Sequence, residues 1–352
     1  GKTSVAEGLL YLAKATNRLG KVDDGSSILD FEAEEIKRHI SISAACHHFD
    51  WKKHSVYFVD TPGDDNFLAE TRAALQVADS AVIIIDAVDG VKVGTEKVNG
   101  YAENLRLPRL IFINKMERER ANFAKTVQEI QDILKVKPVL LQLPIGQEAS
   151  FKGVVDLVAN KAYVYDGSGK ATETAIPADL QDEVEAQRGE LLNFAAESDD
   201  ELIEKFLEEG QLSQEEILRG LRQGTLAGNF VPVLCGAATP LIGLNLLLDA
   251  INAFLPSPPD RGPIVGKNPK DQSEISLPAD PDGPLCAYVF KTVADPYAGR
   301  LSLFRIYSGE VRSDSSFYNA TKGTVERCGQ LFQLEAKTRS LSKVLARDVS
   351  LQ

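Results

Sequence analysis

The stretch VYFVDTPGD, residues Val56 to Asp64, joins a short apolar run to a polar turn and decides the fold class. An apolar run of this length without strict alternation is typical of a strand that is buried on both faces. Pro62 and Gly63 favour a turn directly after that strand. An aspartate at the strand end can hold the water shell of Mg²⁺, and the N–H of a nearby glycine can meet a phosphate. A plain Asp-Pro-Gly turn is the alternative reading.

The same pattern occurs three more times. Apolar runs at 81–85, 110–113 and 231–235 end at Asp86, Asn114 and Gly236. Helical stretches lie between the runs, for example Leu68 to Val77 and Ala121 to Leu134. Strand, polar loop and helix in repetition predict an α/β fold with a doubly wound parallel sheet. Ligands of such sheets bind at the carboxyl ends of the strands, which is where the polar clusters lie.

The chain opens on Gly1-Lys2-Thr3, which matches the end of a phosphate-binding loop of the pattern G-x-x-x-x-G-K-[ST]. A helix is predicted over Ser4 to Leu19, with its amino end facing an anion. In such a loop the lysine pairs with the β- and γ-phosphates, and the Thr hydroxyl ligates Mg²⁺. The glycine-rich half of the loop is not in the chain, so we expect the chain as given to bind nucleotide weakly or not at all.

Two further motifs follow the third and fourth strands. Asn114-Lys115-Met116-Glu117 offers an amide, a lysine stem and a carboxylate that can together read a guanine, although a solvated charged loop is the alternative. At Gly236-Ala237-Ala238 a backbone N–H can meet the guanine O6. Each motif is modest alone. All four in order, each at the end of a predicted strand, predict a guanine-nucleotide-binding fold.

Arg38-His39-Ile40-Ser41-Ile42 lies between the first two motifs and makes the prediction specific. Translational GTPases carry R-G-I-T-I at this place, followed by D-T-P-G-H and N-K-x-D. The chain resembles the elongation factor G family within that group, from Gly1 to about Asp348. Further matching stretches are residues 87–91, 144–148, 151–157, 232–236, 255–258 and 295–300.

The resemblance implies a P-loop GTPase domain over residues 1–137 and 229–258, with an inserted α+β subdomain over 138–228. A linker over 259–283 and an incomplete antiparallel β-barrel, domain II, over 284–352 would follow. The polar, proline-rich residues after Leu255 and the short strands after Leu285 agree with this division.

The resemblance also implies the roles of the site residues. Gly1, Lys2 and Thr3 would bind the phosphates, and Thr3, Ser41 and Asp60 would hold Mg²⁺. Gly63 would sense the γ-phosphate. The residues expected at the guanine base are Asn114, Lys115, Glu117, Ala237 and Ala238. The segment from Ile28 to Ser43 would be mobile without GTP, because its anchors would be the γ-phosphate and Mg²⁺.

The chain departs from the family pattern at several of these positions. Asp64 stands where the family has the histidine that positions the attacking water, and a carboxylate beside a phosphate is repelled. Ser41 replaces threonine and keeps the hydroxyl. Glu117 replaces aspartate and is one methylene longer, while Ala237 replaces a serine whose backbone N–H makes the expected contact. We therefore expect slow GTP hydrolysis if Asp64 faces the site.

Composition sets further limits. The net charge of −12 gives no support to a wholly electrostatic nucleic-acid binder. No apolar run is long enough to span a membrane. The four cysteines are scattered, which favours reduced thiols and a cytoplasmic location. The family resemblance implies a monomer that binds GTP or GDP with Mg²⁺ and contacts ribosomal RNA and the ribosomal stalk proteins.

Three functions are compatible with the sequence. The first is an elongation-factor-G-like GTPase that acts in translocation on the ribosome. The second, favoured by Asp64, is a GTP-dependent ribosome-binding regulator that hydrolyses slowly. The third is another large translational GTPase, of the release-factor or ribosomal-protection type. A structural module without GTPase activity fits the four motifs poorly.

Overall fold

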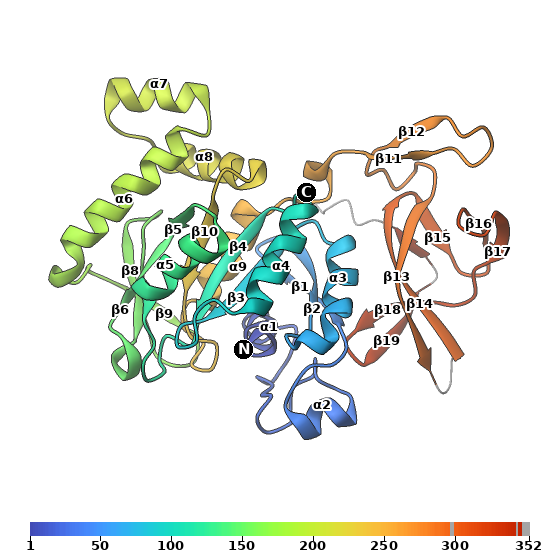
Figure 1. Ribbon diagram of the computed structural model, residues 1–352, viewed down its shortest axis with the longest axis horizontal. Coiled ribbons are helices and arrows are strands. Elements are labelled where there is room, and N and C mark those ends of the chain that lie inside the picture. Colours follow the sequence, from blue (N-terminus) through green and yellow to red (C-terminus); the bar gives the residue numbers. More distant parts are fainter. Residues whose placement is uncertain (296–298, 343, 347–352) are drawn as a thin grey trace.

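The computed structural model describes residues 1–295, 299–342 and 344–346 of the chain, so Pro296 to Ala298 of the matching stretch 295–300 lie outside it. Figure 1 shows three parts in a row. An α/β domain lies in the middle, a helical insert extends from one side of it, and a β-rich domain lies on the other side. The α/β domain carries every site residue predicted from the sequence.

A parallel sheet forms the centre of the α/β domain. Its strand order is β3-β4-β10-β5 among the described residues. These strands are β3 (Ala81–Asp86), β4 (Arg109–Asn114), β5 (Pro138–Leu140) and β10 (Val231–Cys235). Asp86 pairs with Asn114 in the register of β3 and β4, so two predicted polar strand ends lie side by side. The α/β fold class with a doubly wound parallel sheet is confirmed.

Alternate side chains of the sheet pack into two different cores. Leu110, Phe112 and Leu234 pack with α1 (Lys2–Leu12) and α9 (Leu244–Phe254). Ile111, Ile113, Val233 and Cys235 pack with α5 (Phe123–Leu134) on the other face. Helix α4 (Val93–Asn104) contacts both β3 and α5. Burial on both faces explains why these strands read as continuous apolar runs.

One predicted strand lies outside that sheet. Residues 56–59 belong to β2 (His54–Asp60), which pairs antiparallel with β1 (Ala45–Trp51) in a hairpin. Within the described part of the chain, β2 has no hydrogen-bonded partner on its other edge. The prediction of four neighbouring parallel strands was therefore wrong for this one, because a hairpin lets the chain return at once with local pairing.

The helix predicted over Ser4 to Leu19 is shorter in the structure. Helix α1 ends at Leu12, and Lys14 takes a left-handed conformation with φ of 60°. The N–H of Ala15 then donates to the C=O of Leu10, which satisfies a carbonyl at the helix end. The chain after Lys14 is thereby free to run towards the predicted switch segment, which contains α2 (Ala33–Arg38).

The insert combines a small antiparallel sheet with three helices. Its strands are β6 (Gln142–Ile145), β7 (Gly153–Asp156), β8 (Lys161–Tyr165) and β9 (Ala171–Thr174). Its helices are α6 (Gln181–Ala196), α7 (Asp200–Glu209) and α8 (Gln214–Ala227). Because β5 pairs with β10 in the parallel sheet, the part outside that sheet starts near Gln142 and not at Pro138. Figure 1 shows α7 on the side away from the β-rich domain.

The C-terminal part consists of antiparallel strand pairs. The segment 259–283, predicted as a linker, contains the hairpin of β11 (Ile264–Lys267) and β12 (Glu274–Leu277). The later strands pair as β13 with β14, β15 with β20, β16 with β17, and β18 with β19. Their bounds are Cys286–Asp295, Gly299–Ser308, Glu310–Arg312, Ser316–Asn319, Thr324–Arg327, Leu331–Glu335, Thr338–Ser342 and Val344–Ala346, from β13 to β20.

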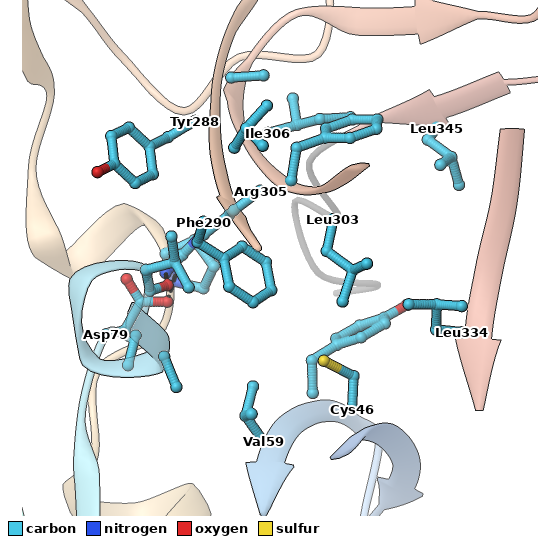
Figure 2. A pocket seen from close by; sticks show the side chains of 18 of the residues that line it. Cys46, Val59, Asp79, Tyr288, Phe290, Leu303, Arg305, Ile306, Leu334 and Leu345 are labelled. Carbon is cyan, nitrogen blue, oxygen red and sulfur yellow. Dashed lines mark hydrogen bonds and ion pairs between the residues drawn. The ribbon is translucent and has the colours of Figure 1, made fainter. Parts of the chain in front are cut away.

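The β-rich domain contacts α3 (Leu68–Gln76), the helix that follows the predicted phosphate-sensing turn. Lys291 Nζ lies 2.6 Å from Glu70 Oε2, and Arg305 Nη2 lies 2.5 Å from Asp79 Oδ2. Figure 2 shows Arg305 and Asp79 beside the apolar side chains of the two domains. A crevice of about 2640 Å³ runs along this seam and continues between β2 and β3. The two domains thus meet at a helix that is directly connected to the site.

Candidate functional site

Three oxygen-bearing side chains converge at the amino end of α1. Thr3 Oγ1 donates a hydrogen bond to Asp60 Oδ2 at 2.7 Å and lies 3.0 Å from Ser41 Oγ. They come from the first turn of α1, the segment before β1 and the carboxyl end of β2. The three residues predicted to hold Mg²⁺ are therefore neighbours, although 57 positions of sequence separate Thr3 from Asp60.

Asp60 is a buried carboxylate without a full counter-charge. Burial raises its pKa to about 6, while the hydrogen bond from Thr3 and the charge of Lys2 act in the other direction. Only 7% of the residue is exposed. A buried carboxylate in such surroundings favours a bound cation, because the cation restores the charge balance that water would provide outside.

Asp30 adds a second carboxylate that the motifs did not reveal. Its Oδ1 accepts a hydrogen bond of 2.7 Å from Ser41 Oγ, and its Oδ2 is buried with no partner among the described residues. Burial also raises the pKa of this carboxyl group. Oxygen ligands from hydroxyl and carboxylate groups are those that Mg²⁺ prefers, so the residues present fit a magnesium ion. Across the described ranges, no group of three or more His, Cys, Asp and Glu side chains could hold a metal, so the fit depends on the two hydroxyl groups as well.

Lys2 lies between this cluster and the turn after β2. A Cβ atom added at Gly63 would lie only 2.3 Å from Lys2 Nζ, so the position tolerates no side chain unless the lysine moves. Burial lowers the pKa of the Lys2 ammonium group, and the charges of Asp60 and Asp30 oppose that shift. The ammonium group and the glycine backbone are thus together at the place where the sequence predicts a phosphate.

The Asp64 side chain is bonded within its own turn. Its Oδ1 accepts hydrogen bonds from the backbone N–H of Asn66 at 2.9 Å and from Asn66 Nδ2 at 2.7 Å. In this way it caps the 3-10 helix η1 (Asp65–Phe67), and its side chain is exposed. The structure therefore gives the Asp64 side chain a local structural task, and among the described residues it makes no hydrogen bond to another site residue.

The predicted base-binding residues meet at the ends of β4 and β10. Asn114 Oδ1 accepts a hydrogen bond of 2.9 Å from the N–H of Ala238, and Asn114 Nδ2 lies 3.5 Å from the C=O of Gly1. The N–H of Met116 donates to the C=O of Gly236. These bonds join the loops after β4 and β10 to each other without a ligand. They also link the expected base-binding part of the site to the start of α1. Ala237 is fully buried in the same loop.

Glu117 has a free acceptor at this place. Its Oε2 is buried and has no hydrogen-bond partner within the described part of the chain, while its Oε1 lies 3.6 Å from Arg118 Nε. A buried oxygen without a donor costs free energy, about 1–3 kcal/mol for a polar group in general. The arrangement fits a ligand that brings N–H groups, as the edge of a guanine does.

The switch segment has anchors of its own that the motifs did not predict. Glu35 Oε1 accepts hydrogen bonds from the N–H groups of Ile42 and Ser43, and Glu70 accepts one from Ala44. Glu7 of α1 accepts three bonds, from the Ser27 hydroxyl and the N–H groups of Ile28 and Leu29. Carboxylates of the chain thus bind the backbone of this segment in addition to the expected γ-phosphate and Mg²⁺, and its mobility without GTP stays a prediction.

Two family models match the chain. The elongation factor Tu GTP-binding domain matches residues 1–257, and elongation factor G domain 2 matches residues 284–344. The chain belongs to the elongation factor G family of translational GTPases. The family resemblance stated from the sequence is thereby confirmed for the N-terminal GTPase domain and domain II, and guanine-nucleotide binding follows from the first match.

A solved structure agrees with this assignment. A crystal structure of a protein from Thermus thermophilus matches with a TM-score of 0.85 and 28% sequence identity. The match covers 98% of this chain and 49% of that chain, so this chain spans about half the length of its structural relative. In the part of the chain that the structure describes, no helix is long and apolar enough to cross a membrane.

Proposed function

We propose that this protein is a translation elongation factor that binds GTP with Mg²⁺ and acts on the ribosome in a translocation-type step. The proposal rests on the cluster of Thr3, Ser41 and Asp60, whose side-chain oxygens are all expected to bind the metal. The Thr3 hydroxyl lies within hydrogen-bond distance of both the Ser41 hydroxyl and the Asp60 carboxylate. A buried carboxylate with a raised pKa beside two hydroxyl groups is typical of functional sites.

Each remaining residue has a role that follows from its place. Lys2 would neutralise the terminal phosphates, and the backbone N–H of Gly63 would donate a hydrogen bond to the γ-phosphate only in the GTP state. Gly1 lies at the start of α1, where free N–H groups favour an anion. Thr3, Ser41 and Asp60 would hold Mg²⁺, which when bound neutralises charge on the β- and γ-phosphates.

The base would be held at the ends of β4 and β10. Asn114 and Glu117 offer polar groups to the guanine edge, and the stem of Lys115 would cover the face of the ring. The N–H groups of Ala237 and Ala238 lie in the loop that is joined to Asn114. We propose that GTP and GDP bind here in preference to adenine nucleotides, because buried polar groups left without a partner penalise the wrong base.

A second function, a slowly hydrolysing GTP-dependent regulator of the ribosome, is favoured by Asp64. Its carboxylate caps η1 and cannot donate a hydrogen bond to orient water when it is ionised. The GTPase activity that we propose is therefore slow. The partners would be ribosomal RNA and, for the insert, the stalk proteins, and the protein would act as a cytoplasmic monomer.

Nucleotide titration of the full-length protein, with and without ribosomes, tests this proposal. We expect GTP and GDP, but not ATP, to bind with Mg²⁺ dependence, and GTP to promote ribosome binding. A translocation assay then separates the two functions, since only the elongation factor moves tRNA and mRNA. Equal binding of ATP and GTP, or ribosome binding that is indifferent to nucleotide, would refute the proposal.

A further inference from the structure

Lys115 is fixed by an ion pair at the place where the base is expected. Its Nζ lies 2.5 Å from Asp86 Oδ2, and the side chains of the two residues are 37% and 20% exposed. Lys115 directly follows β4 and has a left-handed backbone with φ of 66°. Asp86 ends the neighbouring strand β3 and is level with Asn114. The pair therefore joins two strand ends at the base side of the site.

Asp86 is itself held rigidly. Its Oδ1 accepts a hydrogen bond of 2.9 Å from the N–H of Val88, and its backbone C=O accepts one from Gly90. The N–H of Ala87 donates to the C=O of Asn114. Partial burial acts to raise the pKa of Asp86, but the bonds from Lys115 and from the backbone outweigh it, and the pKa is lowered. The carboxylate is thus ionised and has one orientation.

A lysine side chain loses much freedom when it is fixed. Its rotamer entropy is among the largest of any side chain, and ordering such a side chain upon binding opposes affinity. The aliphatic stem of a lysine can cover an apolar face while its ammonium group finds a polar partner. Asp86 is that polar partner for Lys115, so the lysine can be ordered before a ligand binds.

We propose that Asp86 is a positioning residue that holds the Lys115 stem ready to cover the face of the purine base. This inference rests on the guanine-nucleotide function proposed above. Since Asp86 neutralises the lysine charge, Lys115 acts here through the geometry of its stem. The opposite view is that Asp86 matters only as a negative charge near the phosphates, and the two views predict changes of opposite sign.

The variant Asp86→Asn separates them. The asparagine keeps an oxygen for the N–H of Val88, so the turn is preserved, but it loses the ion pair. If Asp86 positions Lys115, the affinity for GDP falls about three- to tenfold, and the affinity for GMP falls by the same factor because the contact is with the base. If Asp86 acts only as a charge, removing it tightens GDP binding.

Asp89→Asn is the matched control. Asp89 lies in the same loop and pairs with Lys92 at 2.7 Å, but those side chains are 48% and 63% exposed. We expect this variant to bind GDP like the unmodified protein. Urea unfolding of both variants shows whether either one is destabilised, and a GDP loss shared equally by both variants would overturn the positioning role.

A second readout does not depend on nucleotide. In nucleotide-free protein, the NMR signal of the Lys115 side-chain ammonium group should broaden or vanish in Asp86→Asn and stay sharp in Asp89→Asn. An unchanged signal in Asp86→Asn would overturn the inference. If the full-length unmodified protein is folded but binds no guanine nucleotide, the proposed function fails, and the NMR comparison still decides whether Asp86 fixes Lys115.

Discussion

Two aspartates four positions apart show how differently the two halves of the site are built. Asp60 ends strand β2, is buried, and is bonded to Thr3 beside Ser41 and Lys2. Asp64 lies in the turn that follows, is exposed, and bonds only to Asn66 among the interactions of its side chain in the described structure. In the half that would bind phosphate and metal, the expected ligands are hydrogen-bonded to one another. At the position of the family histidine, Asp64 is an exposed residue that caps the short helix η1.

This difference separates binding from hydrolysis in physical terms. Binding depends on buried groups whose bonds to one another fix them before the ligand arrives, which lowers the cost of ordering. Hydrolysis depends on a group that can orient water beside the γ-phosphate. The account therefore predicts that the full-length protein binds GTP well and turns it over slowly.

The largest effect is expected at Asp64. In Asp64→His, ribosome-stimulated GTP hydrolysis should rise about 10²–10⁴-fold, the usual contribution of a positioned proton-handling group. Nucleotide affinity should change little, because the hydrogen bonds of the Asp64 side chain in the described structure go to Asn66 and not to a binding residue. Single-turnover hydrolysis with saturating ribosomes measures the rate. Asp65→His, which makes the same change one residue later, is the control and should leave the rate as it was.

A smaller effect concerns stability and pH at Asp60. Its pKa of about 6 lies above the ordinary value of 3.8, so the folded state binds more protons than the unfolded state between these values. Stability in metal-free buffer should therefore fall as pH rises from about 4 to 6, by about 3 kcal/mol for a shift of two pKa units.

Urea unfolding across this pH range tests the sign. Asp60→Asn should remove that part of the slope, and Mg²⁺ with GDP should stabilise the unmodified protein above pH 6 more than the variant. Asp64→Asn is the control, since its carboxylate is exposed. A slope that is the same in Asp60→Asn and in the unmodified protein would show that Asp60 does not carry the effect.

The guanine contact at Glu117 should respond on a similar or smaller scale. Aspartate at this position would accept two bonds from the guanine edge without folding back, whereas Glu117 has a buried oxygen that lacks a partner among the described residues. Glu117→Asp should tighten GDP binding by roughly 1.5–3 kcal/mol, the value of one good hydrogen bond to a charged group. Calorimetry measures it, and equal affinities of the two proteins would refute the idea.

The smallest effect is expected in the exposed turn. Lys97 Nζ pairs with Asp65 Oδ2 at 2.8 Å, but the two side chains are 42% and 55% exposed. Lys97→Gln should change the free energy of unfolding by less than about 1 kcal/mol, since solvent screens such pairs. GDP affinity should stay the same. A large loss of either quantity would mean that the turn is more firmly integrated than its exposure indicates.

Local sequence was a good guide to the strand ends. Asn114 ends β4 and Gly236 follows β10 as the apolar runs predicted, because strands buried on both faces read as continuous apolar runs with polar ends. Asp60 also ends a strand, but most of β2 is exposed or half-buried, so the expectation of burial on both faces was wrong for that run. The sequence also identified the hydroxyl of Ser41 through the family resemblance. These features depend on residue type and on order along the chain, and both are visible in a sequence.

The sequence did not show which side chains bond to one another or which of them are buried. Asp30 and Glu35 belong to no recognised motif, and Asp86 was recognised only as the polar end of a strand. Only the fold shows that they bind Ser41, the switch backbone and Lys115. The sequence placed Asp64 at the catalytic position, but it could not tell that the carboxylate would cap η1. Likewise, the pairing of β2 with β1 depends on a turn at Lys52 and Lys53, both with positive φ, which propensity does not favour.

The most direct test follows GTP bound to the unmodified protein on ribosomes. GTP labelled in its γ-phosphate is mixed with protein and ribosomes, and bound GTP and released phosphate are measured in the same samples over time. The account predicts that bound GTP reaches saturation quickly, while phosphate is released far more slowly than by Asp64→His. Phosphate release as fast as that of the histidine variant, with equal binding, would contradict the separation of the two halves.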